Sequence, residues 1–194
     1  MTLLAVIRHA PTAWSEDGRL QGRSDPPLSP GGIDCARGWQ VPTALADCRW
    51  VSSPLRRAIE TARLLGVAEP AIEPRLVEMS WGAWEGWRLS ELRAALGEEM
   101  AAREADGLDF RPPAGESPRE VQRRLAPFLD EIGRGGEMTA AVTHKGVVRA
   151  LLALATGWAM RDDPPCRLRW PAAHLFRLDR QGRPVVERLN LPLA

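Results

Sequence analysis

Two of the three histidines in the chain lie at the ends of apolar segments, and each has a basic residue beside it. Arg8 precedes His9, and Lys145, the single lysine in the chain, follows His144, while a third apolar segment runs into Arg57. A neutral imidazole is a nucleophile in group transfer, and guanidinium groups bind phosphate oxygens in bidentate geometry. If the three segments end at one edge of a sheet, these side chains converge on one pocket. The predicted ligand of such a pocket is a phosphate dianion.

The charges around His9 predict its protonation state. Nearby positive charge disfavours the imidazolium form, so we expect the pKa of His9 to be lowered and its lone pair to be available at neutral pH in the empty site. A bound phosphate opposes this shift. A single histidine at a strand end usually has only a structural role. Two of them, His9 and His144, each near an arginine, favour a functional role, whereas His174 lacks such neighbours and is predicted to be structural.

The elements that must position these residues alternate between short aliphatic runs and amphipathic stretches. The aliphatic runs predict strands over residues 3–9, 49–53 and 138–144, and a final hairpin or edge pair over 174–178 and 184–189. Helices are predicted over residues 30–42, 54–66, 90–104, 117–132 and 146–155, and a long ordered loop over 10–30. This order predicts an α/β fold, a three-layer sandwich with a mostly parallel central sheet and helices on both faces, in a single domain over residues 1–194.

The composition restricts the classes of partner. Lys and Arg number 26 and Asp and Glu 25, so the net charge of +1 gives no electrostatic case for nucleic acid or an anionic membrane. The 3 cysteines have no CxxC spacing, and together with 3 histidines they indicate neither a disulfide framework nor a metal site. No apolar run approaches the roughly 18 residues that span a bilayer. We therefore expect a soluble, cytoplasmic protein with no metal or other cofactor, and the sequence carries no signal for its oligomeric state.

Six segments of the chain carry a resemblance to a known family. They follow one another in the family's order, and they are residues 4–12 (LAVIRHAPT), 18–22 (GRLQG), 53–62 (SPLRRAIETA), 78–86 (EMSWGAWEG), 115–117 (GES) and 142–149 (VTHKGVVR). Together these motifs resemble the histidine phosphatase superfamily, which has the phosphoglycerate-mutase-like fold. The dipeptide Arg-His alone does not point to any family, whereas the occurrence of all these segments in this order is specific to this one.

The resemblance implies roles for five residues. His9 is similar to the nucleophile that becomes phosphohistidine, and Arg8, Arg57 and His144 are similar to the rest of the phosphate pocket. The resemblance gives the phosphate-binding role to Arg57 and not to Arg56, because the phosphate-binding arginine of the family directly precedes Ala-x-x-Thr. Glu78 is similar to the general acid that protonates the leaving oxygen and then acts as the base that activates water. That double role needs a carboxyl group that holds a proton beside a phosphate dianion.

Four further residues are predicted as possible substrate contacts: Ser15, Gln21, Gly22 and Lys145. The segment that contains Gln21 and Gly22 is equally typical of a solvated loop. Lys145 has two interpretations, because its side chain either points into solvent or engages a second anionic group of the substrate at the pocket mouth. The chain departs from the family at Ala10, where Gly is usual, at Ser15, where Asn is usual, and at Lys145, where Gly commonly follows the second histidine. These departures bear on the shape of the pocket and on the substrate.

Three functions compete for such a site. The leading hypothesis is a metal-independent phosphomonoesterase that hydrolyses a small phosphorylated metabolite through phosphohistidine. The runner-up is phosphoryl transfer of the phosphoglycerate mutase type, but the mutases of the family are longer between the acid and the second histidine. A non-catalytic phosphate- or partner-binding module is disfavoured because all five implied site residues are present. The GAWEG segment and the compact length are similar to those of α-ribazole phosphatases, which makes α-ribazole phosphate one specific substrate hypothesis.

Overall fold

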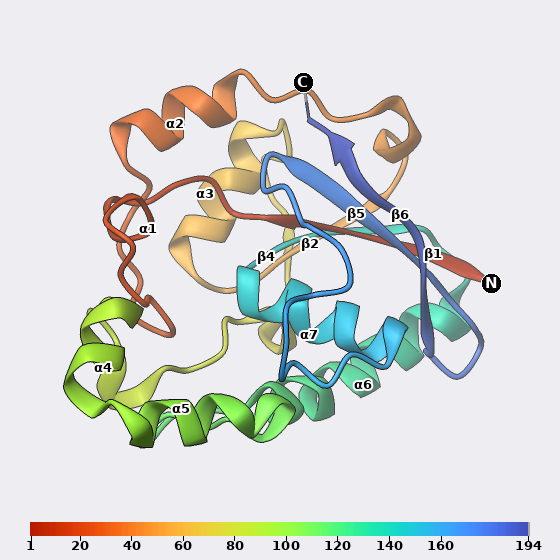
Figure 1. The fold of residues 1–194 in the computed structure, drawn as a ribbon. Helices are drawn as coiled ribbons and strands as arrows, with labels where there is room; N and C mark the ends of the chain where they lie inside the picture. The colour runs from red at the N-terminus through yellow and green to blue at the C-terminus, as the bar shows by residue number, and fades with distance from the viewer. Residues whose placement is uncertain (194) are drawn as a thin grey trace.

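The computed structural model describes residues 1–193 and is built on a six-stranded sheet with the order β3-β2-β4-β1-β5-β6 (Figure 1). The strands are β1 (Thr2–Arg8), β2 (Arg49–Ser52), β3 (Ala71–Ile72), β4 (Thr139–Thr143), β5 (Ala172–Leu178) and β6 (Pro184–Pro192). The first four pair in parallel, and β5 and β6 extend the sheet with antiparallel pairing beside β1. All of β4 is buried, as expected for a central strand that is covered on both faces. The sheet is mostly parallel, as predicted.

Helices cover both faces of this sheet. They are α1 (Ala13–Glu16), α2 (Pro30–Arg37), α3 (Arg56–Leu64), α4 (Leu89–Leu96), α5 (Glu98–Ala105), α6 (Pro118–Gly135) and α7 (Lys145–Thr156). In Figure 1, α6 and α7 lie below the sheet and α2 and α3 above it. Alternate residues of β1 enter separate cores, because Leu4 and Val6 pack with α6 and α7, whereas Ala5 and Ile7 pack with α3. The predicted three-layer α/β sandwich is therefore confirmed.

Local capping interactions explain two of the predicted helix starts. The side chain of Ser29 accepts a hydrogen bond from the N–H of Gly32, and Pro30 occupies the first turn of α2. Ser117 and Glu120 form a reciprocal capping box at the start of α6. In the described part of the chain, no helix is both long enough and apolar enough to cross a membrane.

Several predicted elements differ from the structure, among them the helix predicted over 30–42, which ends at Arg37. The strand β3 was not predicted. The helix predicted over 90–104 is two helices, because Gly97 between α4 and α5 has a φ of +52°, which interrupts the helical backbone. The loop predicted over 10–30 contains the one-turn helix α1, which is capped by the side chain of Thr12. The helix predicted from residue 54 begins at Arg56. The exposed two-residue edge strand β3 has no hydrophobic alternation that predicts it.

The carboxyl ends of β1, β2 and β4 lie side by side at one edge of the sheet. Arg8 is paired in register with Thr143, and the N–H of His9 donates to the carbonyl oxygen of Thr143 at 2.9 Å. The N–H of Ser53 donates to the carbonyl oxygen of Val142, also at 2.9 Å. The residues that follow the three strands therefore meet at the edge where α/β sheets bind their ligands.

Candidate active site

His9 is buried at the end of β1, and its ring is held in one tautomer. Nδ1 of His9 lies 2.7 Å from the carbonyl oxygen of Ala10, which can only accept a hydrogen bond, so Nδ1 carries the proton. Nε2 is therefore unprotonated, and it accepts a hydrogen bond from Nε of Arg57 at 3.3 Å. Ala10 supplies this carbonyl although the family usually has Gly at its position. The site thus contains a nitrogen lone pair directed at an anion-binding group.

The surroundings of His9 keep its ring neutral. Burial lowers the pKa of His9 well below its usual value, and the positive charges of Arg8 and Arg57 lower it further. The direction agrees with the sequence-based prediction, but burial and not charge is the larger cause. A neutral ring is the form that can attack an electrophile.

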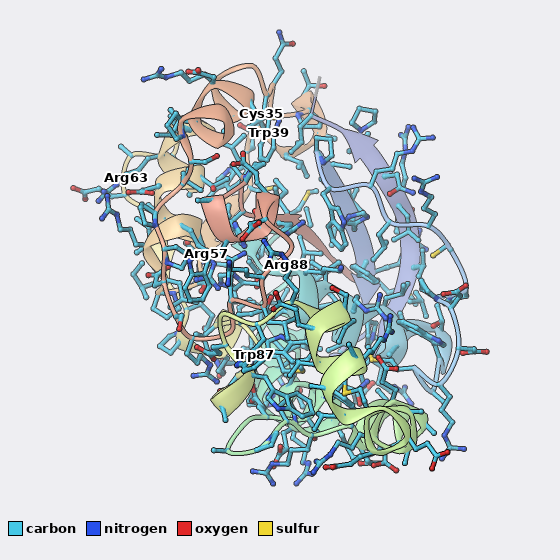
Figure 2. All side chains as sticks on the ribbon, turned by 60° about the vertical axis from the view of Figure 1, so that its left-hand side comes forward. Cys35, Trp39, Arg57, Arg63, Trp87 and Arg88 are labelled. Atoms are coloured by element: carbon cyan, nitrogen blue, oxygen red, sulfur yellow. The ribbon has the colours of Figure 1, made fainter. Side chains whose placement is uncertain are left out.

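Arg57 lies in the first turn of α3 (Figure 2). Its side chain is fully buried. One Nη atom donates to the carbonyl oxygen of Gly22 at 2.8 Å, and the other donates to that of Ser24 at 2.8 Å and to the Asp25 carboxylate at 3.0 Å. The side chain of Arg56, by contrast, is 66% exposed. The structure therefore places Arg57, and not Arg56, beside His9, in agreement with the motif.

His144 follows β4 directly and is fully buried beside His9. The ring centroids of the two histidines are 5.2 Å apart, and the ring planes meet at 56°. Nε2 of His144 lies 2.6 Å from Oγ of Ser53, whereas Nδ1 has no hydrogen-bond partner among residues 1–193. Burial lowers the pKa of His144 well below its usual value, and His9, Arg57 and Arg8 add to the shift. An unpartnered buried nitrogen of this kind is a candidate contact for a phosphate oxygen.

Two backbone N–H groups hold the carboxylate of Glu78. Oε1 accepts from Met79 at 2.8 Å, and Oε2 accepts from Gly146 at 3.2 Å in the first turn of α7. A Cβ atom at Gly146 would lie 2.4 Å from Oε1 of Glu78, so a glycine is needed for the helix to approach the carboxylate this closely. The sequence predicts N–H donors at Gly146, as the start of a helix, but not the close approach to Glu78 that requires a glycine there.

Arg8 and Lys145 share one aromatic neighbour, Trp170, in the segment before β5. Cζ of Arg8 lies 5.1 Å from the centroid of the indole ring, and Nζ of Lys145 lies 6.0 Å from it. These distances are within the range of cation–π interactions. Burial lowers the pKa of Arg8, and its Nε has no hydrogen-bond partner in the described residues. Lys145 itself is exposed, so its ammonium group lies at the edge of the site, and its contact with a second anionic group stays a prediction.

The side chains of Ser15 and Gln21 support the loop after β1. Ser15 and Thr12 form a capping box at the start of α1, and Oε1 of Gln21 accepts from the Thr12 hydroxyl at 2.9 Å. Gly22 contributes its carbonyl oxygen to Arg57, and its φ of +55° favours glycine. These residues hold the loop after β1 in place through hydrogen bonds within the protein. Their contact with a substrate stays a prediction.

Glu85, in the GAWEG segment, links two loops of the site. Its Oε1 accepts from the N–H groups of Arg23 at 2.8 Å and Trp81 at 3.2 Å. Its Oε2 accepts from the N–H of Ser24 at 2.8 Å and from the hydroxyl of Ser24 at 2.6 Å. These bonds fix Ser24, whose carbonyl oxygen binds Arg57. The sequence-based prediction missed this role of Glu85, whose signal is an acidic residue within a Trp-rich segment.

A small cavity of about 90 Å³ opens beside Arg8 and His9. Its other walls are Pro11, Cys35, Trp39, Trp170 and Pro171, and Figure 2 shows Cys35 and Trp39 close together at α2. A larger surface cavity, of about 470 Å³, lies over α3 and contains none of the five proposed catalytic and phosphate-binding residues. The smaller cavity is therefore the one that adjoins the predicted nucleophile.

Comparison with known proteins identifies the family. The model of the family described as "histidine phosphatase superfamily (branch 1)" matches residues 4–192. A glucosyl-3-phosphoglycerate phosphatase of Mycolicibacterium vanbaalenii is 33% identical over 175 residues, which are 83% of this chain and 77% of that protein. A 2,3-bisphosphoglycerate-dependent phosphoglycerate mutase 2 of Gloeobacter violaceus is 32% identical over 167 residues, which are 78% of this chain and 74% of that protein.

The solved structure of a candidate α-ribazole-5′-P phosphatase from Escherichia coli is similar to this chain with a TM-score of 0.78. The two are 26% identical, and the match covers 97% of this chain and 96% of the other. A bifunctional protein of Mycobacterium tuberculosis is 34% identical over 79% of this chain, and the chain spans 44% of the length of that relative. The match to the family over nearly all described residues agrees with the motifs around His9, Arg57 and His144: the chain belongs to the histidine phosphatase superfamily, branch 1.

Proposed function

We propose that this chain is a phosphomonoesterase that hydrolyses a small phosphorylated metabolite through a phosphohistidine on His9, without a metal ion. The observation that carries the proposal is the state of His9, which is protonated at Nδ1 and accepts a hydrogen bond from Arg57 at Nε2. Membership of the histidine phosphatase superfamily supports the same reaction class. The phosphatase among the relatives at 33% identity supports hydrolysis.

In the first half of the proposed reaction, the phosphoryl group moves from the ester oxygen to His9. Nε2 forms a bond to phosphorus while the bond between phosphorus and the ester oxygen breaks, and the leaving oxygen takes a proton from the Glu78 carboxyl group. Nδ1 keeps its proton, and the carbonyl oxygen of Ala10 stabilises the positive charge that the ring acquires. Arg8 and Arg57 neutralise the charge on the phosphoryl oxygens.

In the second half, water replaces the organic group. The Glu78 carboxylate accepts a proton from water while the water oxygen forms a bond to phosphorus. The bond between phosphorus and Nε2 of His9 breaks, and the electron pair returns to the ring. The products are inorganic phosphate and an alcohol, and Glu78 is protonated again for the next cycle.

Phosphoryl transfer of the mutase type is the second candidate, because a phosphoglycerate mutase is among the relatives at 32% identity. A mutase must keep water away from the phosphohistidine and present it with an organic acceptor. Between Glu78 and His144 lie the helices α4, α5 and α6, two short 3₁₀ turns and the strand β4. This stretch is short for a mutase, which favours access of water and therefore hydrolysis.

A screen of phosphomonoesters, each assayed with and without a chelator, tests the proposal. The panel contains p-nitrophenyl phosphate, phosphoserine, glucosyl-3-phosphoglycerate, α-ribazole-5′-phosphate, and 3-phosphoglycerate with a bisphosphate cofactor. We expect release of inorganic phosphate from at least one ester at a rate that the chelator does not change. Isomerisation faster than hydrolysis would establish the mutase instead, and a rate that depends on added divalent metal would contradict the metal-independent reaction. Phosphate binding without any turnover would identify a binding module.

A further inference from the structure

The segment that carries Glu78 depends on other parts of the chain for its position. Residues 75–80, here called the acid segment, lie outside the strands and α-helices, and only the 3₁₀ turn Pro74–Leu76 gives them regular structure. Buried carbonyl groups need hydrogen-bond partners, and an irregular segment must find them elsewhere. The carbonyl oxygen of Leu76, for example, accepts from the hydroxyl of Thr143 at 2.8 Å.

Arg124 of α6 binds two further carbonyl oxygens of the acid segment. Its Nη2 donates to Val77 at 2.7 Å, and its Nη1 donates to Arg75. The side chain of Arg124 is 19% exposed, so most of the guanidinium group is removed from water and relies on these protein partners. The residue directly before Glu78 is thereby attached to α6.

Arg23 binds the acid segment at Glu78 itself. Nε of Arg23 donates to the backbone carbonyl oxygen of Glu78 at 2.8 Å. Arg23 comes from the loop after β1, which also carries the carbonyl groups that hold Arg57. Two arginines from different elements therefore hold the backbone on which the proposed general acid is mounted.

Glu116 joins these two arginines. Its Oε1 accepts from Nε of Arg124 at 2.8 Å, and its Oε2 accepts from Nη2 of Arg124 at 3.2 Å and from Nη2 of Arg23 at 3.3 Å. The backbone N–H of Glu116 donates to the carbonyl oxygen of Ser80 at 2.9 Å, at the end of the acid segment. The carboxylate side chain is only 15% exposed. Glu116 is the central residue of the GES segment.

We propose that Glu116 is a positioning residue for the general acid, acting through Arg23 and Arg124 to hold the carboxyl group of Glu78 at the leaving oxygen. The inference rests on the proposed function, because it assumes that Glu78 protonates the leaving group. Glu116 neutralises two guanidinium groups that would otherwise repel each other, and it fixes both in the orientation that binds the acid segment. Without its charge, the backbone of Glu78 is held less firmly, and small displacements of a catalytic group have large effects on rate.

The test is the leaving-group dependence of the Glu116→Gln variant. An activated aryl ester such as p-nitrophenyl phosphate needs little protonation, whereas an alkyl phosphate needs the acid. We expect kcat/KM, which reports transfer of the phosphoryl group to His9 and not the later attack of water, to fall by about 10- to 100-fold for an alkyl phosphate and by less than about threefold for p-nitrophenyl phosphate. Glu120→Gln is the matched control, since Glu120 takes part in the capping box of α6 and its carboxylate forms no hydrogen bond with the acid segment. It should leave the ratio of the two rates unchanged.

A double-variant cycle separates this role from a general loss of stability. In a Glu78→Gln background there is no acid to position, so Glu116→Gln should cause no further loss with the alkyl phosphate. Arg124→Lys provides a second variant that keeps the charge but loses the forked contacts, and it should show the same leaving-group dependence.

The proposal would be overturned if Glu116→Gln and Arg124→Lys lowered kcat/KM equally for both esters. It would also be overturned if Glu116→Gln caused as large a loss in the Glu78→Gln background as it does in the wild-type enzyme. Failure of the proposed function has a different signature. If Glu78→Gln alone lowers kcat/KM equally for both esters, Glu78 is not the acid, and the role of Glu116 fails together with that of Glu78.

Discussion

Nε2 of His9 and Nε of Arg57 are in direct contact at 3.3 Å, and the guanidinium group is anchored on its far side by the loop after β1. A phosphoryl group bonded to Nε2 therefore lies within reach of a guanidinium group whose orientation is already fixed. The contact also explains why His9 remains neutral, since burial and the charge of Arg57 both disfavour its protonated form. The proposed nucleophile and the proposed phosphate-binding group form one structural unit.

Replacement of Arg57 by lysine should damage this unit severely. A lysine ammonium group cannot reproduce the forked donors that bind His9, Gly22 and Ser24. We expect kcat/KM to fall by about 10²- to 10³-fold, the size of effect seen when one preorganised donor is removed. Arg56→Lys is the matched control on the neighbouring exposed residue, and it should retain activity within about twofold. Comparable losses in both variants would contradict the assignment of Arg57.

Gly146→Ala should displace the Glu78 carboxylate, because the added Cβ would lie 2.4 Å from Oε1. The expected result is a selective loss of activity on alkyl phosphates, with a smaller loss on p-nitrophenyl phosphate. Gly135→Ala, at the end of α6, is the control, since its Cβ would meet no atom within 4 Å. Steady-state kinetics with both esters measures the difference, and an unaltered preference in Gly146→Ala would show that the close approach of α7 has no catalytic importance.

Stability should fall as the pH is lowered below the usual histidine pKa. Burial lowers the pKa of His9 and His144 well below 6.5 and that of His174 to about 4. Below pH 6.5 the unfolded chain therefore binds more protons than the folded chain, and the free energy of unfolding decreases as the pH falls. Three such groups give a slope of up to about 4 kcal/mol per pH unit, which urea unfolding at pH 7.5 and 5.5 would measure. A His174→Gln variant should lower this slope by the contribution of one proton, about 1.4 kcal/mol per pH unit. A free energy of unfolding that does not change between the two pH values would show that the histidines titrate normally.

The position of Lys145 beside Arg8 and Trp170 leads to a prediction on specificity. If its ammonium group binds a second anionic group of the substrate, Lys145→Met should raise KM about tenfold for substrates with an additional carboxylate or phosphate. The KM for p-nitrophenyl phosphate should hardly change, and Lys145→Arg should restore most of the loss. An unchanged KM for a doubly anionic substrate would show that Lys145 is only a surface residue.

The sequence predicts the fold well where burial produces a strong pattern. β4 is buried along its whole length and is visible as Ala-Ala-Val between two threonines, and α6 has a capping box and one apolar face. Prediction fails where one residue changes the backbone, as at Gly97, whose positive φ divides the helix predicted over 90–104. It also fails for β3, whose two exposed residues pair at the edge of the sheet without any local hydrophobic signal.

In the candidate site, the residues with the proposed chemical roles are visible in the sequence, whereas the residues that position them are not. His9, Arg57 and His144, which the structure places side by side, can be proposed from the sequence because their side chains are chemically specific and lie in motifs. The roles of Gly146 beside Glu78 and of Glu85 were missed because both depend on residues distant in the sequence. Gly146 acts by lacking a Cβ atom, and Glu85 by accepting backbone hydrogen bonds from another loop. Such roles depend on tertiary contacts that spacing along the chain does not encode.

The proposed hydrolysis depends on a phosphoryl group that His9 carries during turnover. Rapid acid-free quenching of the enzyme with ³²P-labelled substrate, followed by peptide mapping, tests it directly. We predict a base-stable, acid-labile adduct on His9 that forms and decays at rates compatible with kcat, and the absence of both adduct and turnover in His9→Ala. Substantial turnover by His9→Ala, or label on another residue, would contradict the account.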